Sequence, residues 1–421
     1  MFASKHIVFA TFGSLGDVHP FFAIGREMQA RGHRVTLATS EYHRAKIERE
    51  GFGFQPVRPD IADFGGPAGI FRTFGEGLGG PIKVLRRDIL PRLRETCDDL
   101  LSAAKDADFL GAHPIYYPAP LVAEKLRLPW AAMLLQPLAL FSASDPSMLP
   151  ILHATLQHLV FTLGAFATRP LVRPIHRLRA DLGLPATSKH PMFGAQYSPR
   201  LNLALFSPLL APPQTDWPAA TIATGFPFFD DGNSAEEKQS TSLQEFLEAG
   251  PPQLIFTLGS TAVDLSVQFY LDSFVAAQTL GYRAIFLASA EAVQQLRSPL
   301  PTGMLALRYA PHGALFPRAA AIIHSGGIGT TAQALRSGQP QLVVPFGFDQ
   351  PDNARRVVRL GVGRTLPHRH YNAARAAQLL RTLLSDVTMA RRAADIGRQV
   401  QFENGAVTAA DAIEKLFSPR K

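Results

Sequence analysis

Residues 308–354 decide the fold of this chain, and they read RYAPHGALFPRAAAIIHSGGIGTTAQALRSGQPQLVVPFGFDQPDNA. Within them, Ala319–Ile323 is an apolar run of strand length, and a glycine-rich turn follows directly after His324. Residues 330–336 then have a helical pattern that ends before Gly338. A strand, a glycine turn and a helix in this order point free backbone N–H groups and the positive end of the helix at an anion. We therefore predict an α/β fold with a site for a phosphorylated ligand at this turn.

A second apolar run, Gln341–Phe346, leads to the pair Asp349–Gln350. In an open parallel sheet, ligands bind beyond the carboxyl ends of the strands, so residues that follow neighbouring strands meet on one rim. We expect His324, Asp349 and Gln350 to surround the phosphorylated ligand together with the glycines.

Two interpretations of this stretch compete. Residues 327–332, Gly-Ile-Gly-Thr-Thr-Ala, match the dinucleotide fingerprint, and Asp349 follows at about the 20-residue spacing of a ribose contact, which favours a nicotinamide-dependent oxidoreductase. The longer string adds a Tyr309-Ala-Pro-His312 turn ahead of the strand and the Asp349–Gln350 pair after it. Together these features resemble the donor-binding signature of family 1 glycosyltransferases, which have the two-domain GT-B fold.

The amino-terminal part repeats the same pattern. The apolar run Ile7–Phe12 is followed by a glycine turn, by a helical segment that ends before Gly32, and by a second strand at Arg34–Thr39. We therefore expect two Rossmann-like α/β halves with parallel sheets, facing each other across a cleft. Asp17 lies where the N-cap of the first helix is expected, with Pro20 in the first turn. Its carboxylate either only caps free amides or also faces the cleft, and its position alone favours neither.

The domain boundary is predicted from composition. Residues 207–227 are rich in proline and residues 230–242 are polar, as is typical of a connection between halves. We expect an acceptor-binding domain over 1–230, a linker and first helix over 231–250, a nucleotide-sugar domain over 251–400, and a helix at 401–421 that packs back on the first domain. A second glycine turn, Gly259-Ser260-Thr261, follows the first strand of the second half and is also suited to an anion.

Composition excludes some partners. The net charge of +8 comes from scattered arginines, and no basic run interleaved with aromatic residues predicts nucleic-acid binding. Cys97 is the only cysteine, which excludes an internal disulfide and favours a reducing cytoplasm. Ile7–Phe12 is too short for a signal peptide.

Two segments suggest contacts with lipophilic molecules. Met148–Thr168 is apolar over about the length of a membrane span, but it contains histidines and a glycine, so we predict a helix pair that lines an apolar acceptor pocket. The arginines that follow, up to Arg179, either contact anionic headgroups at the inner membrane face or form a solvated helix face. The glycine-rich residues 65–80 form either a lid or a plain connection.

Two other candidates lie around the strand Phe109–Leu110. His113 lies at its carboxyl end and is expected either to line the cleft or to be structural. Asp106 and Asp108 resemble a metal–diphosphate D-x-D motif, but they precede the strand, which is the wrong end for a ligand, so no metal site is predicted.

Several strings extend the resemblance over nearly the whole sequence, toward the rhamnosyltransferases of rhamnolipid synthesis and the bacterial sterol and glycopeptide glycosyltransferases. They are GSLGDVHP (13–20), APPQTDWP (211–218), TGFPFFD (224–230), FTLGS (256–260), YAPHGALFP (309–317) and HSGGIGTTAQALRSGQPQLVVPFGFDQPDNARRVVRLGVG (324–363).

The resemblance implies roles for individual residues. The general base falls on Asp17, with His19 as the fallback, and His113 and Phe141 are expected at the acceptor. The donor-binding residues that it implies are Gly16, Ser260, Tyr309, His312, His324, Gly326, Gly327, Gly329, Thr330, Asp349 and Gln350. Tyr309 and His312 replace the tryptophan and glutamine that hold uracil in the plant branch, which is compatible with a thymidine nucleotide.

The implied reaction is an inverting sugar transfer without a metal or other cofactor, from a dTDP- or UDP-linked sugar, with dTDP-rhamnose favoured, to a lipophilic hydroxyl such as that of a hydroxyalkanoyloxyalkanoate. The alternatives are UDP-glucose-dependent transfer to a sterol, polyketide or flavonoid-like acceptor, and, more distantly, the oxidoreductase. A lipid-binding protein without a working nucleotide site is disfavoured, because Asp17, His324 and Asp349 are all present.

Overall fold

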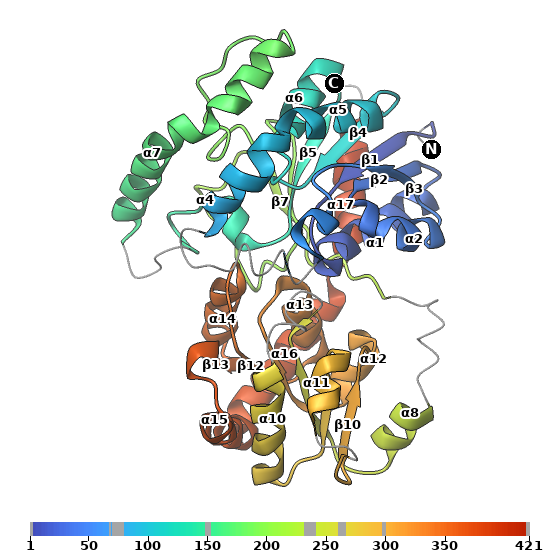
Figure 1. Ribbon diagram of the computed structural model, residues 1–421, viewed down its shortest axis with the longest axis vertical. Coiled ribbons are helices and arrows are strands. Elements are labelled where there is room, and N and C mark those ends of the chain that lie inside the picture. Colours follow the sequence, from blue (N-terminus) through green and yellow to red (C-terminus); the bar gives the residue numbers. More distant parts are fainter. Residues whose placement is uncertain are drawn as a thin grey trace. The chain divides into compact units, whose positions relative to one another are not determined.

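The computed structural model describes residues 3–66, 69, 80–147, 153–230, 241–259, 267–296 and 300–417. The chain divides into two compact units, of which the first is Met1–Phe228 with Asn404–Lys421 and the second is Phe229–Glu403. Each unit is built around one parallel β-sheet with helices on both faces (Figure 1). The prediction of two Rossmann-like α/β halves is therefore confirmed.

The first unit contains a seven-stranded parallel sheet in the order β3-β2-β1-β4-β5-β6-β7. Its strands are β1 His6–Ala10, β2 Arg34–Thr39, β3 Gly53–Pro56, β4 Phe109–Ala112, β5 Trp130–Leu134, β6 Asn202–Ala204 and β7 Thr221–Ala223. Its α-helices are α1 Leu15–Ala30, α2 Arg44–Arg49, α4 Gly80–Val84, α5 Leu93–Ala104, α6 Ala119–Leu126, α7 Ala154–Asp181 and α17 Gly405–Lys415. Shorter turns are η1 Glu41–His43, η2 Ile61–Phe64, η4 Leu85–Ile89, η5 Leu90–Arg92 and η6 Pro137–Leu140.

Alternation along β1 explains how the two faces of this sheet are covered. Successive side chains of a strand point to opposite faces. Val8 and Ala10 pack in the cluster formed with α5, α6 and α7. Phe9 points the other way and meets Phe21 of α1, with the ring centroids 5.8 Å apart. Both faces of the sheet are therefore buried, which is why the strand is almost wholly apolar.

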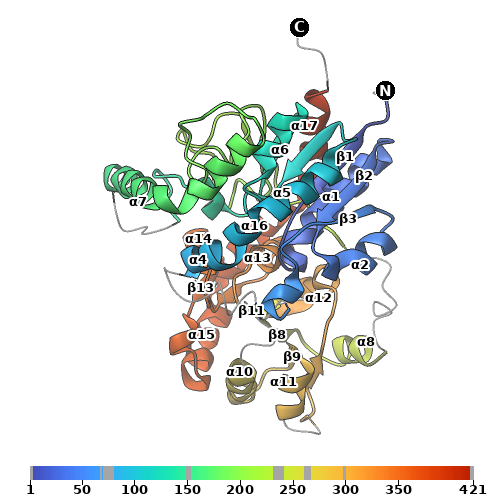
Figure 2. The same ribbon diagram turned by 45° about the horizontal axis from the view of Figure 1, so that its top comes forward.

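The last helix, α17, belongs to the first unit and packs against α1 (Figures 1 and 2). The Arg31 guanidinium lies 2.7 Å from carboxylate oxygens of both Asp411 and Glu414. Phe417, just after the helix, meets the ring of Phe109 edge-on at 6.2 Å. Ion pairs and an aromatic contact thus hold this carboxyl-terminal segment on the first sheet.

The second unit contains a six-stranded parallel sheet in the order β10-β9-β8-β11-β12-β13. Its strands are β8 Gln253–Thr257, β9 Ala284–Leu287, β10 Met304–Leu307, β11 Ala319–His324, β12 Gln341–Val343 and β13 Gly363–Thr365. Its α-helices are α8 Thr241–Glu248, α10 Val267–Leu280, α11 Ala290–Gln295, α12 His312–Leu315, α13 Ile328–Ser337, α14 Gln350–Arg359, α15 Ala373–Ser385 and α16 Val387–Phe402, with turns η8 Phe316–Arg318 and η9 His368–His370. On one face Ile255 and Ile322 join a buried cluster, and on the other Phe256 stacks on Phe286 at 5.2 Å.

The structure corrects the prediction of a helix pair over the apolar segment Met148–Thr168. From Ala154 onward it is one 28-residue helix, α7, which continues through the arginines to Asp181 at the edge of the first unit (Figure 2). Pro170 and Pro174 lie inside this helix and do not end it. Residues 148–152 lie outside the described part of the chain, as do most of residues 65–80. Among the helices that the structure describes, none has both the length and the apolar character needed to cross a membrane.

Candidate functional site

Both sheets have a topological switch point, where the strand order reverses. In the first unit this point lies between β1 and β4, and in the second it lies between β8 and β11. Ligands of open α/β sheets bind beyond the carboxyl ends of the strands at such points. Asp17 follows β1, His113 follows β4, Gly259 follows β8 and Gly326 follows β11. The sequence candidates therefore fall at the two places that the fold favours.

Asp17 lies in the first turn of α1, but it is not the N-cap as expected. Ser14 is the N-cap, and Asp17 is the third helical residue. Its Oδ2 accepts hydrogen bonds from the Ser14 backbone N–H at 2.8 Å and from the Ser14 hydroxyl at 3.1 Å. Burial raises the pKa of the Asp17 carboxyl to about 6, and the two bonds from Ser14 act in the opposite direction. Pro20, expected in the first turn, lies further inside the helix.

The turn before α1 is shaped around this carboxylate. Gly13 has a φ of +135°, and a Cβ atom added to it would lie 2.3 Å from Asp17 Oδ2. The imidazole Nε2 of His43 lies 2.9 Å from the Gly13 carbonyl oxygen and holds the turn from the side of β2. His43 was not among the residues predicted from the sequence, because only the tertiary structure brings it to the turn. The absence of a side chain at Gly13 thus makes room for the carboxylate of Asp17.

The other first-unit candidates surround the same strand ends. Gly16 and His19 lie in the first two turns of α1, and the His19 ring lies 6.0 Å from that of Phe22. The His113 N–H donates to the Ala10 carbonyl at the end of β1, and burial lowers the pKa of the His113 ring to about 4. Its Nε2 has no hydrogen-bond partner among the described residues. His113 is therefore a neutral imidazole at the switch point.

Phe141 lies further out, at the end of η6. It has a φ of +48°, and its ring contacts Phe161 of α7 at 6.0 Å and Phe193 at 5.2 Å. Asp108 accepts from the His6 N–H at 2.8 Å and pairs with Lys5, as expected of a turn carboxylate at the other end of β4. Within the described ranges, no cluster of three histidine, cysteine or acidic side chains is arranged to hold a metal ion.

In the second unit, His324 ends β11 and is fully buried. Its Nδ1 accepts from the Gly326 N–H at 3.1 Å, so Nε2 carries the proton and donates to Gln341 Oε1 at 3.0 Å. Burial lowers the pKa of His324 to about 4 and keeps the ring neutral. The ring thus fixes the turn, and a direct contact with a diphosphate would require it to exchange one of these two bonds.

The glycine turn itself leaves space at one position and none at its neighbour. At Gly326, which has a φ of +90°, a Cβ would lie 2.7 Å from Val343 Cγ1. At Gly327, the N-cap of α13, a Cβ would meet nothing within 4 Å. Gly329 and Thr330 belong to the first turn of α13, which carries no acidic residue. This helix end is therefore open and electropositive, as an anion site requires.

The β8 turn lies beside this helix end. A Cβ at Gly259, which has a φ of +71°, would lie 3.3 Å from the Thr330 hydroxyl oxygen. The Ser325 hydroxyl donates to the Leu258 carbonyl at 2.9 Å and ties the two turns together. The two glycine turns that sequence analysis singled out are thus adjacent, while Ser260 lies outside the described residues.

Asp349 and Gln350 start α14, on the neighbouring side of the same turn. Gln350 is turned inward, and its Oε1 accepts from the N–H groups of Phe346 at 2.9 Å and Gly347 at 3.3 Å. The Asn353 amide donates to Asp349 Oδ2 at 2.7 Å and to the Gly326 carbonyl at 2.9 Å. Asn353 is fully buried and links the glycine turn to Asp349. The sequence showed this residue within the string, but nothing in its spacing assigned it a role.

Tyr309 and His312 precede β11 in the sequence. Tyr309 is 42% exposed. The His312 ring stacks on Phe316 at 4.4 Å, and burial lowers its pKa to about 4, with His324 nearby. The second unit therefore places an exposed aromatic residue and a neutral imidazole ahead of the glycine turn.

Family models match both ends of the chain. Residues 7–131 match the N-terminal domain of glycosyltransferase family 28. Residues 279–407 match the C-terminal domain of proteins like the erythromycin biosynthesis protein CIII. Sequence analysis named family 1, and the resemblance to glycosyltransferases is confirmed. The closer likeness to the rhamnosyltransferases of rhamnolipid synthesis stays a prediction.

Two curated relatives align with almost the whole chain. It is 29% identical to the O-mycaminosyltylonolide 6-deoxyallosyltransferase of Streptomyces fradiae, over 98% of both chains. It is 28% identical to the sterol 3-beta-glucosyltransferase of Aspergillus fumigatus over 97% of this chain, which spans only 30% of that larger enzyme.

Solved structures show the same fold. The glycosyltransferase of kitacinnamycin superposes with a TM-score of 0.76 at 21% identity, over 98% of this chain and 99% of that one. The spinosyn rhamnosyltransferase SpnG complexed with thymidine diphosphate superposes with a TM-score of 0.69 at 18% identity, over 98% of this chain and 100% of that one. Together with the family models and relatives, these matches support the glycosyltransferase interpretation of residues 327–332 over the oxidoreductase interpretation. The chain is a glycosyltransferase of the GT-B fold that uses a nucleotide sugar, and its two ends match the family 28 amino-terminal model and the erythromycin CIII-like carboxyl-terminal model.

Proposed function

We propose that this enzyme transfers a 6-deoxyhexose, with rhamnose favoured, from a dTDP-linked donor to a hydroxyl of a lipophilic acceptor, with inversion at the anomeric carbon and Asp17 as the general base. The observation that carries the proposal is the Asp17 carboxylate, which lies at the switch point of the first sheet and whose pKa burial raises to about 6. A carboxylate with a pKa closer to neutral is a stronger base than an ordinary surface aspartate.

The reaction is a single displacement. The acceptor oxygen forms a bond to the anomeric carbon on the face opposite the nucleotide, and the bond from that carbon to the diphosphate oxygen breaks. The hydroxyl proton passes to Asp17, and the electron pair of the broken bond leaves with the diphosphate. One Asp17 oxygen accepts both hydrogen bonds from Ser14, so the other is the one proposed to take the proton.

The charge that develops on the diphosphate needs stabilisation. The proposal assigns this to the backbone N–H groups of Gly327, Gly329 and Thr330 and to the positive end of α13, which fixed geometry holds ready before the reaction. No metal or other cofactor is part of the proposed mechanism. Asp349, held by Asn353, is proposed to bind sugar hydroxyls together with Gln350.

The donor and acceptor classes rest on the relatives. The relative of Streptomyces fradiae is named for a 6-deoxyallosyl group, which favours a 6-deoxy sugar. SpnG is a rhamnosyltransferase solved with thymidine diphosphate, which favours a thymidine-linked donor. The sterol 3-beta-glucosyltransferases support a second candidate, glucose transfer from UDP-glucose to a sterol. Both acceptor classes are lipophilic alcohols, and a hydroxyalkanoyloxyalkanoate remains a third.

We also propose that α7 contacts an anionic membrane surface. Its first half exposes Leu159, Leu163 and Phe166, each more than half accessible, and Arg169 lies over the Phe166 ring. The helix carries no acidic residue before Asp181. Exposed apolar side chains beside arginines are typical of a helix that lies in a bilayer interface. In this proposal the enzyme is cytoplasmic and takes its acceptor at the inner face of the membrane.

A panel of purified substrates tests the proposal. The enzyme is incubated with dTDP-rhamnose, UDP-glucose and NAD⁺, each with a macrolide aglycone, a sterol or a hydroxyalkanoyloxyalkanoate, and the products are weighed by mass spectrometry. We expect the mass increase of one deoxyhexose, from the dTDP sugar alone and undiminished by a metal chelator. Glucose transfer to the sterol would support the second candidate instead. Absence of transfer from every sugar nucleotide would overturn both.

A further inference from the structure

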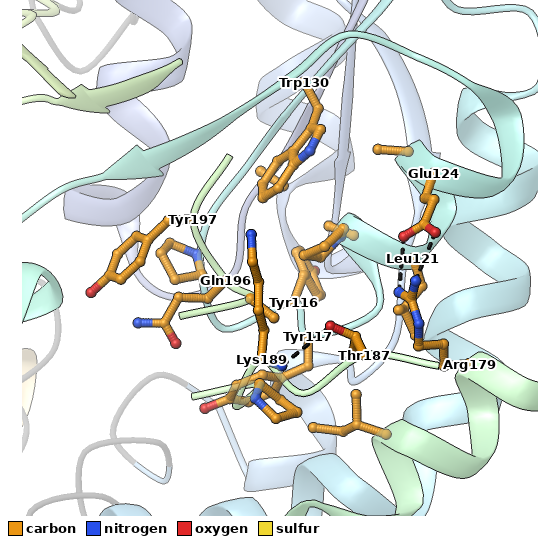
Figure 3. A pocket seen from close by; sticks show the side chains of 18 of the residues that line it. Tyr116, Tyr117, Leu121, Glu124, Trp130, Arg179, Thr187, Lys189, Gln196 and Tyr197 are labelled. Atoms are coloured by element: carbon orange, nitrogen blue, oxygen red, sulfur yellow. Dashed lines mark hydrogen bonds and ion pairs between the residues drawn. The ribbon is translucent and has the colours of Figure 1, made fainter. Parts of the chain in front are cut away.

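The first unit contains a pocket of about 590 Å³ (Figure 3), and of the two residues expected at the acceptor, His113 lines it and Phe141 does not. It lies between α6, the second half of α7 and the segment 187–200. It runs from His113, beyond the carboxyl end of β4, to Trp130, at the first residue of β5. The pocket thus follows α6, whose 8 residues span about 12 Å. Its volume is within the range of roughly 300–1,000 Å³ that holds small organic ligands.

Apolar and aromatic side chains form most of the pocket wall. Tyr116, Tyr117 and Trp130 line it together with Leu121 and Ile175, from α6, α7 and the strand ends. Figure 3 shows the Trp130 indole directed into the space. A wall of this kind favours a ligand with an apolar body, because binding removes that body from water.

The charged residues of the pocket are mostly cationic. Arg127, Arg179, Lys189 and Arg200 line it, and Glu124 is the one carboxylate among the lining residues. The charge of Glu124 is compensated within the protein, because both its carboxylate oxygens pair with the Arg179 guanidinium at 2.7 and 2.8 Å. Arg127, Lys189 and Arg200 make no side-chain hydrogen bond or ion pair within the part of the chain that the structure describes. The pocket therefore carries an excess of three positive charges.

Lys189 has the position best suited to meet a ligand. It lies on the 187–200 segment, where its backbone N–H bonds the Thr187 hydroxyl at 3.2 Å. Figure 3 shows its side chain extending into the pocket on the side of Trp130. A lysine ammonium is a compact point charge that needs no planar partner, whereas doubly charged phosphates are commonly held by arginine forks. The fork of Arg179, which also lines the pocket, is closed by Glu124.

We propose that this pocket binds a small apolar carboxylic acid, with its hydrocarbon body against Trp130 and the α6 face and its carboxylate at the Lys189 ammonium. Apolar walls fit the body, and the uncompensated cations at the rim fit a single negative charge. The site goes beyond the proposed sugar transfer, because the ligand is proposed to lie against Trp130, at the amino end of β5, and its binding requires no sugar nucleotide.

The pocket also contacts the residues that hold the Asp17 turn. The hydroxyl of Tyr116, a lining residue, donates to the Thr11 carbonyl at 3.1 Å. The Thr11 hydroxyl in turn donates to the Asp17 carbonyl at 2.9 Å. A bound acid would thus lie two hydrogen bonds from the backbone of the proposed base, through Tyr116 and Thr11.

Tryptophan fluorescence tests the proposal directly. The chain has two tryptophans, so the variant Trp217→Phe leaves Trp130 as the sole reporter. Sodium decanoate is titrated below its micelle concentration, with 1-decanol and decylamine as neutral and cationic probes of the same length. We expect saturable quenching by decanoate, tighter than by either other probe and weakened by salt.

A variant of Lys189 tests whether the positive charge of this side chain contributes to decanoate binding. Lys189→Met should weaken decanoate binding about threefold to fivefold, the scale of a partly exposed ion pair, and leave 1-decanol unchanged. Lys105→Met, at an exposed lysine that does not line the pocket, is the matched control and should change neither probe. Ala195→Phe, which fills the pocket, should abolish binding of both.

Three outcomes would overturn the proposal. They are no saturable signal with decanoate, equal affinity for decanoate and decanol, and decanoate binding that Lys189→Met leaves unchanged. Because the titration contains no sugar nucleotide, none of these outcomes depends on whether the proposed sugar transfer is correct.

Discussion

The glycine turns after β1 and after β11 occupy equivalent places in two similar sheets, yet only the second leaves its helix end open to an anion. After β1, Gly13 makes room for the carboxylate of Asp17 in the first turn of α1. After β11, the first turn of α13 has no acid, and Gly327 leaves open space in front of it. A carboxylate in the first turn fills the anion site that a helix amino terminus offers, and its absence leaves that site open.

The shared topology therefore sets where a ligand can bind, while one acidic side chain decides whether the helix end is open to an external anion. In the first unit the helix end is occupied by the protein's own anion, whose pKa burial raises to about 6. In the second unit it is available to a diphosphate. Substitutions at these two turns test this contrast.

The largest effect is expected for Asp17→Asn. We expect turnover to fall by roughly 10²-fold or more, the scale of losing a general base. Asp106→Asn, an exposed turn carboxylate, is the control and should keep full activity. Turnover is measured with the best donor and acceptor from the panel, and near-normal turnover in Asp17→Asn would remove Asp17 from the mechanism.

The pH profile of the wild type sharpens the same assignment. Asp17 must be ionised to accept a proton, so kcat/KM should fall tenfold per pH unit below about 6, the raised pKa of its carboxyl.

The same raised pKa predicts an effect on stability. The folded state binds the Asp17 proton more tightly than the unfolded state, so ionisation of the carboxylate lowers stability as pH rises through about 6. Asp17→Asn should therefore show no loss of melting temperature at pH 8. A large loss there would indicate a structural role.

Gly13→Ala should give the next largest effect. The added Cβ would lie 2.3 Å from Asp17 Oδ2, so the carboxylate must move, and turnover should fall at least roughly tenfold. Gly51→Ala is the matched control, because Gly51 has a φ of +78° but no atom within 4 Å of its Cβ position. Both variants carry backbone strain, so equal activities would show that the position of the Asp17 carboxylate does not matter.

A pair of neighbouring glycines separates donor binding from folding. Gly327→Ala places its methyl group in open space, so the fold should stay intact while the apparent KM for the donor rises roughly tenfold. Gly326→Ala, whose Cβ would lie 2.7 Å from Val343 Cγ1, should instead lower stability by about 1–3 kcal/mol. Thermal melting measures the loss of stability, and the melting shift that thymidine diphosphate produces measures binding at the donor site. Initial rates at varied donor concentration give the KM. A ligand-induced shift that Gly327→Ala leaves unchanged would contradict an anion site at α13.

The smallest effect is expected for Asn353→Ala. Asn353 positions Asp349 and the Gly326 carbonyl and touches no substrate in the proposal, so we expect a rise in donor KM of about threefold to tenfold with a smaller change in kcat. Gln339→Ala, an amide that bonds only the Pro317 carbonyl among the described residues, is the control. A fall in kcat alone would point to a catalytic role instead.

Much of the local structure could be predicted from the sequence, because glycine turns and apolar runs favour a backbone conformation through neighbouring residues alone. The strand Arg34–Thr39 was predicted with its observed bounds, and the helix before Gly338 began only two residues earlier than expected. The prediction failed for α7, where a helix pair was expected over Met148–Thr168 and the structure has one helix, Ala154–Asp181. The helix continues because Val172, Ile175 and Leu178 pack into the core of the first unit, and local propensity does not carry that information.

The two strand–glycine–helix units and the residues placed at their ends could be predicted from the sequence, because they depend only on chain order and local backbone conformation. Tertiary structure decided what surrounds those residues. It made Ser14 rather than Asp17 the N-cap, turned the His324 ring onto Gly326 and Gln341, and placed Asn353 between Gly326 and Asp349. It also formed the pocket between α6, α7 and residues 187–200. Burial and long-range hydrogen bonds set these features, and both arise only when segments far apart in the sequence are packed together.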